Sequence, residues 1–188
     1  MNKFNFKFRI LLLSTLLALF TSVQAMADVT ICRGFIGAKT VDNLRVPENA
    51  TCNLSGTRVK GTIYVGINAT LTAWNIIVIG NVHAENSKQV NVLEGSRIGG
   101  SVQVALGGGS SVNDSFIDAD LQYGGNSGIL RAMRNSIGGN LQVLRNTGKV
   151  DIRKNVIDGN LQCTENVPAP IGGANVVGGT KEGQCRRL

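Results

Sequence analysis

Few residues of this 188-residue chain have the types and spacing that catalysis requires. Asp118, Asp120 and Asp158 are carboxylates that could act on a polysaccharide, but lyases and hydrolases need such groups clustered with a base or with Ca²⁺. His83 is the only histidine. As a general base it would need a serine such as Ser101 and a third residue to orient it. We therefore predict no catalytic residue, no metal site and no cofactor.

Two sets of polar side chains suit binding better than catalysis. The first set, here called the outward column, recurs at regular intervals and is rich in amides: Arg45, Tyr64, His83, Gln103, Gln122, Gln142 and Gln162. A flat polar stripe of this kind suits an extended polysaccharide, although it is also typical of a solvated sheet face. The second set, here called the cationic cluster, has only Asp151 against it in sequence: Arg131, Arg134, Arg145, Lys149, Arg153 and Lys154. It predicts an anionic glycan or a lipid head group as partner, or simply a solvated charged surface.

The pattern that positions both sets is a repeat of about 20 residues. Each unit reads aliphatic, any, small, polar, aliphatic, polar, aliphatic, as in IGGNLQV from Ile137 and IDGNLQC from Ile157. Eight units recur at nearly constant intervals and begin at Thr40, Val59, Val78, Ile98, Ile117, Ile137, Ile157 and Val177. The alternation has a period of two, which predicts a strand with one buried face. A second aliphatic cluster in each repeat predicts a further inward-facing strand: Val90, Val92, Val112, Ile129, Val150 and Ile152.

A repeat this short cannot bury its own apolar face, so successive units must stack. We predict an all-β fold, a single-stranded parallel β-helix (solenoid) of about eight coils, each of about 19–20 residues. The repeat length, without a six-residue period, favours right-handed winding. Stacking predicts an inward column of Leu44, Ile63, Val82, Val102, Leu121, Leu141 and Leu161.

Stacking also predicts columns of polar residues and of glycine. One polar column contains Asn43, Thr62, Asn81, Ser101, Asp120, Asn140, Asn160 and Thr180, and another contains Asn75, Ser96, Ser115, Asn135, Asn155 and Asn175. Stacked amides can satisfy backbone groups at corners, so we interpret these residues as structural. The glycine column, interrupted by Ala119, marks a tight bend: Gly61, Gly80, Gly100, Gly139, Gly159 and Gly179.

Residues 1–27 predict a cleaved signal peptide. Lys3, Lys7 and Arg9 precede an apolar run over 10–20, and cleavage is expected after Ala25 or Ala27. The run is too short to span a bilayer. We expect a secreted or periplasmic domain over 28–188, with an N-terminal cap and first coil over 28–58, regular coils over 59–162 and a C-terminal cap over 163–188. Without those three cations, 16 of the 19 basic residues remain against 12 acidic ones, and this charge balance indicates no nucleic-acid partner. We also expect no transmembrane segment after the signal peptide.

Four cysteines in an exported chain predict two disulfides. The interval from Cys32 to Cys52 and the interval from Cys163 to Cys185 are each close to one repeat. One repeat corresponds to one coil, and the coil spacing of about 4.8 Å falls inside the Cα–Cα window of disulfides. We predict Cys32–Cys52 and Cys163–Cys185, which staple terminal loops over 32–39 and 168–188 into caps. Such caps favour a monomer and disfavour end-to-end assembly.

The repeated unit [IV]-x-G-N-L-Q-V and the ending GNLQCTENVPAPIGGANVVGGTKEGQC, from Gly159 to Cys185, resemble a group of exported bacterial β-helix repeat proteins of unassigned function. The stacking is similar to that of bactofilins, which polymerise through β-helix ends, and of pectate-lyase-type β-helices. The chain differs from bactofilins by its export signal and closed ends. It differs from pectate-lyase-type β-helices by its lack of clustered catalytic groups.

These observations leave three functional hypotheses. The leading one is an exported, non-catalytic β-helix with a structural or binding role at the cell envelope or outside the cell, possible ligands being glycans. The alternatives are a polysaccharide-active lyase or hydrolase and a bactofilin-like self-assembling scaffold.

Overall fold

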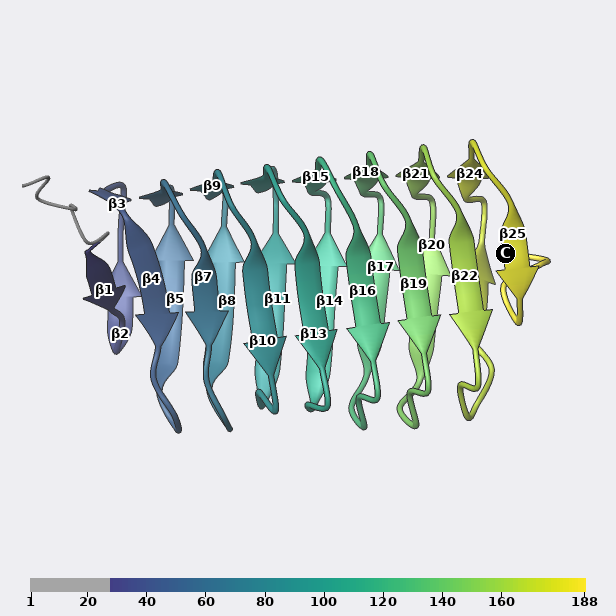
Figure 1. Cartoon of the computed structure of the whole chain (residues 1–188), viewed down its shortest axis with the longest axis horizontal. Helices are drawn as coiled ribbons and strands as arrows, with labels where there is room; N and C mark the ends of the chain where they lie inside the picture. Colours follow the sequence, from purple (N-terminus) through teal and green to yellow (C-terminus); the bar gives the residue numbers. More distant parts are fainter. Residues whose placement is uncertain (1–27) are drawn as a thin grey trace, which may run out of the picture.

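The computed structural model describes residues 28–188, and the predicted signal peptide over 1–27 lies outside this range. All regular structure in the described residues is β-strand, and the chain winds as a row of stacked coils (Figure 1). Within that range no helix is long and apolar enough to cross a bilayer. The predicted all-β parallel solenoid is therefore confirmed.

Each complete coil contributes one strand to each of three parallel sheets, here called A, B and C. Sheet A contains β1 (Val29–Ile31), β4 (Asn43–Val46), β7 (Ile63–Val65), β10 (Val82–Glu85), β13 (Val102–Ala105), β16 (Leu121–Gly124), β19 (Leu141–Leu144), β22 (Leu161–Thr164) and β25 (Lys181–Gly183). Sheet B contains β2 (Gly34–Ile36), β5 (Thr51–Ser55), β8 (Thr70–Trp74), β11 (Gln89–Leu93), β14 (Gly109–Asn113), β17 (Leu130–Met133), β20 (Val150–Arg153) and β23 (Ile171–Gly173). Sheet C contains the two-residue strands β3 (Thr40–Val41), β6 (Arg58–Val59), β9 (Ile77–Val78), β12 (Arg97–Ile98), β15 (Phe116–Ile117), β18 (Ser136–Ile137), β21 (Val156–Ile157) and β24 (Val176–Val177).

The winding is right-handed. In Figure 1 the strands of sheet A nearest the viewer run downward, those of sheet B behind them run upward, and the coils advance from left to right. Sheet A has nine strands and the other sheets eight, because the described chain both begins and ends on sheet A, with β1 and β25.

The core runs along the axis as columns of inward side chains. Leu121 pairs with both Val102 and Leu141 in the register of sheet A, and all three are fully buried. Alternation produces this arrangement because every second side chain of a strand points to the same face. The predicted inward column is buried from Leu44 to Leu161 without exception.

The predicted second inward cluster is wrong at Ile129. Ser110 of β14 pairs with Leu130 of β17, which is buried, and Ile129 is left 48% exposed. Tyr123 is buried in the same core, and its hydroxyl donates to the carbonyl of Arg131 at 2.9 Å. Burial raises the pKa of Tyr123 above its usual value.

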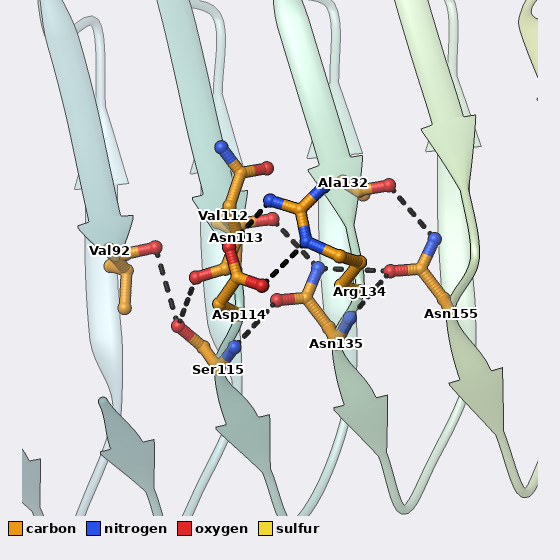
Figure 2. A network of polar contacts seen from close by, with 9 residues as sticks. All are labelled: Val92, Val112, Asn113, Asp114, Ser115, Ala132, Arg134, Asn135 and Asn155. Carbon is orange, nitrogen blue, oxygen red and sulfur yellow. Dashed lines mark hydrogen bonds and ion pairs between the residues drawn. The ribbon is translucent and has the colours of Figure 1, made fainter. Parts of the chain in front are cut away.

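Asparagine side chains close the corner between sheets B and C. The backbone N–H and the Nδ2 of Asn135 both donate to Oδ1 of Asn155, each at 3.0 Å, and Nδ2 also donates to the carbonyl of Val112 (Figure 2). Each amide thus satisfies backbone groups that a corner would leave unpaired. The predicted column is wrong at Asn75. Arg97 pairs with Ile77, which makes Ile76 the equivalent of Ser96, and Asn75 is exposed in a left-handed conformation.

The glycine column is explained by close approach to the preceding coil. A Cβ on Gly159 would lie 2.7 Å from both Oδ1 of Asn140 and the carbonyl oxygen of Gly139. Oδ1 of Asn140 is held in place by the N–H of Asn160, which donates to it at 2.9 Å. Glycine is therefore required where the preceding coil carries such a carboxamide.

Both predicted disulfides are confirmed, at the two ends of the solenoid. The Cα–Cα distances are 5.6 Å for Cys32–Cys52 and 5.2 Å for Cys163–Cys185. In the strand register Cys52 lies opposite Gly34 and Cys163 lies opposite Gly183. Each disulfide partner, Cys32 or Cys185, is therefore two residues away from the position directly opposite. The terminal loops predicted over 32–39 and 168–188 contain strands β2, β23, β24 and β25. Each disulfide therefore joins a terminal segment that itself belongs to the sheets to the neighbouring coil.

Candidate functional site

The outward column forms a line along sheet A. Its positions pair in register from Arg45 on β4 to Gln162 on β22, so each side chain lies beside those of the neighbouring coils. Inward leucine and valine residues on either side in sequence fix its direction by alternation. The structure therefore brings together all seven residues that the sequence placed in this column.

Hydrogen bonds link most of the outward column. His83 Nδ1 lies 3.1 Å from Oε1 of Gln103, and Nε2 of Gln103 donates to Oε1 of Gln122 at 3.0 Å. Farther along, Nε2 of Gln142 donates to Oε1 of Gln162 at 2.9 Å. Side chains that hold one another in this way are pre-organised, which lowers the entropy cost of binding a ligand.

The column ends on a carboxylate. Nε2 of Gln162 donates to Oε2 of Glu182 at 3.0 Å, and Oγ1 of Thr180 donates to Oε1 at 2.5 Å. The hydroxyl of Thr180, followed by the amide of Gln162, lowers the pKa of Glu182 below its usual value. The C-terminal end of the column thus presents an anionic group.

Shallow depressions lie along the same face. One of about 330 Å³ is bordered by Arg45, Glu48, Tyr64, His83 and Glu85. The Tyr64 and His83 rings meet edge to face with centroids 6.4 Å apart, and Tyr64 is 46% exposed. Exposed aromatic rings of this type are common contacts for sugar faces, since they combine an apolar surface with a polar edge.

The residues considered for catalysis do not converge. The hydrogen-bonding partner of the His83 ring is Gln103 rather than a serine. Oδ1 of Asp120 accepts from the N–H of Asn140 at 2.7 Å and so takes the structural place of an asparagine, while Asp118 is exposed. Across 28–188 no three histidine, cysteine, aspartate or glutamate side chains gather as a metal-binding group.

The cationic cluster is divided among different parts of the surface. Arg131 and Arg153 belong to β17 and β20 of sheet B, and Arg134 and Lys154 occupy successive left-handed positions after those strands. Arg145 follows β19 of sheet A, at a different corner. The coils that carry Arg134 and Lys154 lie side by side, since the backbone N–H of Arg134 donates to the carbonyl of Arg153 at 3.0 Å.

Three arginines of the cationic cluster already have carboxylate partners. Arg153 pairs with Asp151, but Arg145 pairs with Glu165 at 3.0 Å and Arg134 with Asp114 at 2.6 Å. Asp151 is the only acidic residue within the 131–154 stretch, but stacking brings in Asp114 and Glu165 from the neighbouring coils. These pairs reduce the positive charge available to an anionic ligand.

The Arg134–Asp114 pair is bidentate. Nε donates to Oδ1 and Nη2 donates to Oδ2, both at 2.6 Å, and Figure 2 shows the guanidinium reaching back to the preceding coil. The hydrogen bond from Arg134 lowers the pKa of Asp114 below its usual value, against an opposing effect of desolvation by partial burial.

Two features were absent from the sequence prediction. A second asparagine ladder, Asn126, Asn146 and Asn166 ending on Gln184, closes the corner between sheets A and B. Its spacing of one repeat was a signal that could have revealed it. The other is a depression of about 220 Å³ over Ala105, Gly124 and Leu144, which no pattern of residue types marked.

Comparison of the chain with protein-family models, with curated proteins and with solved structures finds no match. The candidate site is therefore inferred from the geometry of sheet A alone. The fold is a parallel β-solenoid.

Proposed function

We propose that this chain is an exported, non-catalytic β-helix that binds an extended glycan along the outward column of sheet A. The observation that carries the proposal is the register of this column, which presents a hydrogen-bonding side chain on each of seven successive coils. Adjacent parallel strands are about 4.8 Å apart. This spacing is close to the length of one pyranose residue in an extended chain, so successive sugars would meet successive amides.

Charge favours a neutral glycan on this face. The middle of the outward column consists of glutamines, and the arginines that suggested an anionic ligand are paired with Asp114, Asp151 and Glu165. An anionic glycan bound at the cationic cluster is the weaker alternative, because binding would have to displace these carboxylates.

Export is supported by the cysteines. All four of them, within residues 28–188, are in disulfides, and such bonds persist in oxidising compartments. A secreted or periplasmic location places the chain where envelope and extracellular polysaccharides occur.

The test is a glycan array probed with the chain lacking residues 1–27, at low and high salt. Neutral extended glycans should bind with little dependence on salt. Gln103→Ala combined with Gln122→Ala removes two amides and should weaken binding by about tenfold, since each hydrogen bond contributes about 0.5–1.5 kcal/mol.

The matched control is Asn53→Ala with Asn91→Ala, which removes two outward amides from sheet B and should leave binding unchanged. Absence of binding to every neutral glycan would overturn the proposal. Cleavage of the bound glycan, abolished by His83→Ala, would favour the enzymatic alternative.

Self-assembly is the second candidate, and the N-terminal end supports it. There β1 is the edge strand of sheet A, and Val29, Ile31 and Phe35 are 47%, 54% and 68% exposed. An open edge with apolar side chains is a template for another chain. Sedimentation should then show concentration-dependent polymers that Phe35→Ser reduces, whereas a monomer at every concentration would exclude a scaffold.

A further inference from the structure

The hydrogen-bonded order of the outward column is interrupted once among the glutamines. Gln122 and Gln142 are paired in the backbone register of β16 and β19, yet no hydrogen bond joins their amides in the described structure. Nε2 of Gln122 instead points to Oδ2 of Asp120, at a long 3.5 Å. Oε1 of Gln142 accepts no hydrogen bond from another side chain within 28–188. The gap in the hydrogen-bonded column between Gln122 and Gln142 therefore leaves one amide donor with only this long contact and one amide acceptor without a side-chain donor.

The 220 Å³ depression lies beside this gap. Its apolar surface includes Ala105, Gly124 and Leu144, which are the last residues of β13, β16 and β19. A Cβ added to Gly124 would meet no atom within 4 Å. Gly124 also has no left-handed backbone, so neither a turn nor a close approach explains it. What this glycine provides is open space, at a cost to strand stability.

The lining contains no aspartate, glutamate, lysine or arginine. It therefore suits an uncharged group that has both an apolar part and an amide. We infer that this depression is a subsite for the acetamido group of an N-acetylated hexosamine within the glycan that lies along sheet A. The acetamido methyl contacts Ala105, Gly124 and Leu144, its N–H donates to Oε1 of Gln142, and its carbonyl accepts from Nε2 of Gln122. This inference rests on the proposed function and names the class of sugar that the site selects.

The experiment is calorimetric titration of the chain lacking residues 1–27 with a short oligomer of N-acetylglucosamine and with a glucose oligomer of equal length. The acetylated oligomer should bind about tenfold more tightly, the discrimination expected when a small apolar group fills a matching site. Gly124→Val places a side chain in the depression, starting from a Cβ that meets no atom within 4 Å. It should remove this preference while leaving the weaker binding of the glucose oligomer unchanged.

The matched control is Ser111→Val, which introduces the same side chain at an outward strand position of β14 in sheet B and should keep the preference. Equal affinity for the two oligomers, or a preference that survives Gly124→Val, would overturn the acetamido subsite while the glycan-binding function stands. No binding of either oligomer would also overturn the subsite, and the glycan array would then decide the proposed function separately. Circular dichroism of each variant separates loss of the site from loss of the fold.

Discussion

Asn135 and Asn155 occupy equivalent positions on successive coils, and a single oxygen joins them. Oδ1 of Asn155 accepts both the backbone N–H and the Nδ2 of Asn135, each at 3.0 Å, while Nδ2 of Asn155 donates to the carbonyl of Ala132 at 2.8 Å (Figure 2). One carboxamide therefore satisfies three polar groups of the preceding coil at a corner from which water is excluded.

Asn155→Ala should lower the free energy of unfolding by about 2–3 kcal/mol, because it leaves buried donors and an acceptor without partners. Urea denaturation followed by circular dichroism measures the change. Ser136→Ala, an exposed residue of β18 one coil earlier, is the control and should cost less than about 0.5 kcal/mol. Equal effects of the two substitutions would show that the ladder contributes nothing to stability.

Gly100→Ala should destabilise the protein by about 1–3 kcal/mol, since the new Cβ would overlap Oδ1 of Asn81 on the preceding coil. Ala119 occupies the same column naturally, and there the preceding coil carries Ser101 in place of an asparagine. The serine side chain is shorter, and its Oγ accepts the N–H of Asp120 at 3.3 Å. Combining Gly100→Ala with Asn81→Ser recreates that pair and should recover part of the loss. A double variant no more stable than Gly100→Ala would show that the clash is with the backbone alone.

Replacing Cys163 and Cys185 by serine should destabilise the last coil by about 2–4 kcal/mol, the usual effect of a bond that closes a loop of this length. Cys185 follows Gln184, which ends the second asparagine ladder by accepting from Asn166. Hydrogen exchange should therefore accelerate over 163–188 and stay unchanged over 59–144, because each coil contacts only its neighbours. Acceleration along the entire chain would instead indicate global cooperativity.

The Asp114 carboxyl should titrate below its usual pKa of about 3.9, because the Arg134 guanidinium donates to both of its oxygens. A lowered pKa in the folded state means that the pair stabilises above the unfolded pKa and that this contribution is lost as pH falls through the folded pKa. Side-chain exposures of 53% for Arg134 and 42% for Asp114 keep the contribution small through solvent screening.

NMR titration of the Asp114 carboxyl measures this directly. Arg134→Gln should return the pKa to its usual range, and high salt should do so in part. Lys154→Gln removes a nearby charge that makes no ion pair with Asp114 and serves as the control. An unshifted pKa in the unmodified chain would contradict the bidentate pair.

Much of the architecture was predictable because stacked coils make position in sequence equivalent to position in space. Leu121 and Leu141 recur at the repeat length and are neighbours in the core for that reason. The same rule failed locally at Asn75 and Ile129, where coils of unequal length meet and the longer coil carries its added residue in a corner. A period read across such a corner is wrong by one residue, which turns an inward position outward.

The candidate site was predictable only as a line of residues. Gln103, Gln122 and Gln142 could be placed in one column from their spacing, but the missing bond between Gln122 and Gln142 depends on side-chain rotamers. The carboxylate partners of Arg134 and Arg145 were also hidden, because Asp114 and Glu165 approach them from adjacent coils.

The sequence alone determined the parallel β-solenoid, its inward and outward columns and both disulfide pairings, because a repeat of about 20 residues with a period of two leaves stacking as the way to bury its apolar face. Only the tertiary structure decided which charges are neutralised and where sheet A is hollow. Those properties depend on contacts between side chains of neighbouring coils and on the space left by small residues such as Ala105 and Gly124, and no one-dimensional period encodes them.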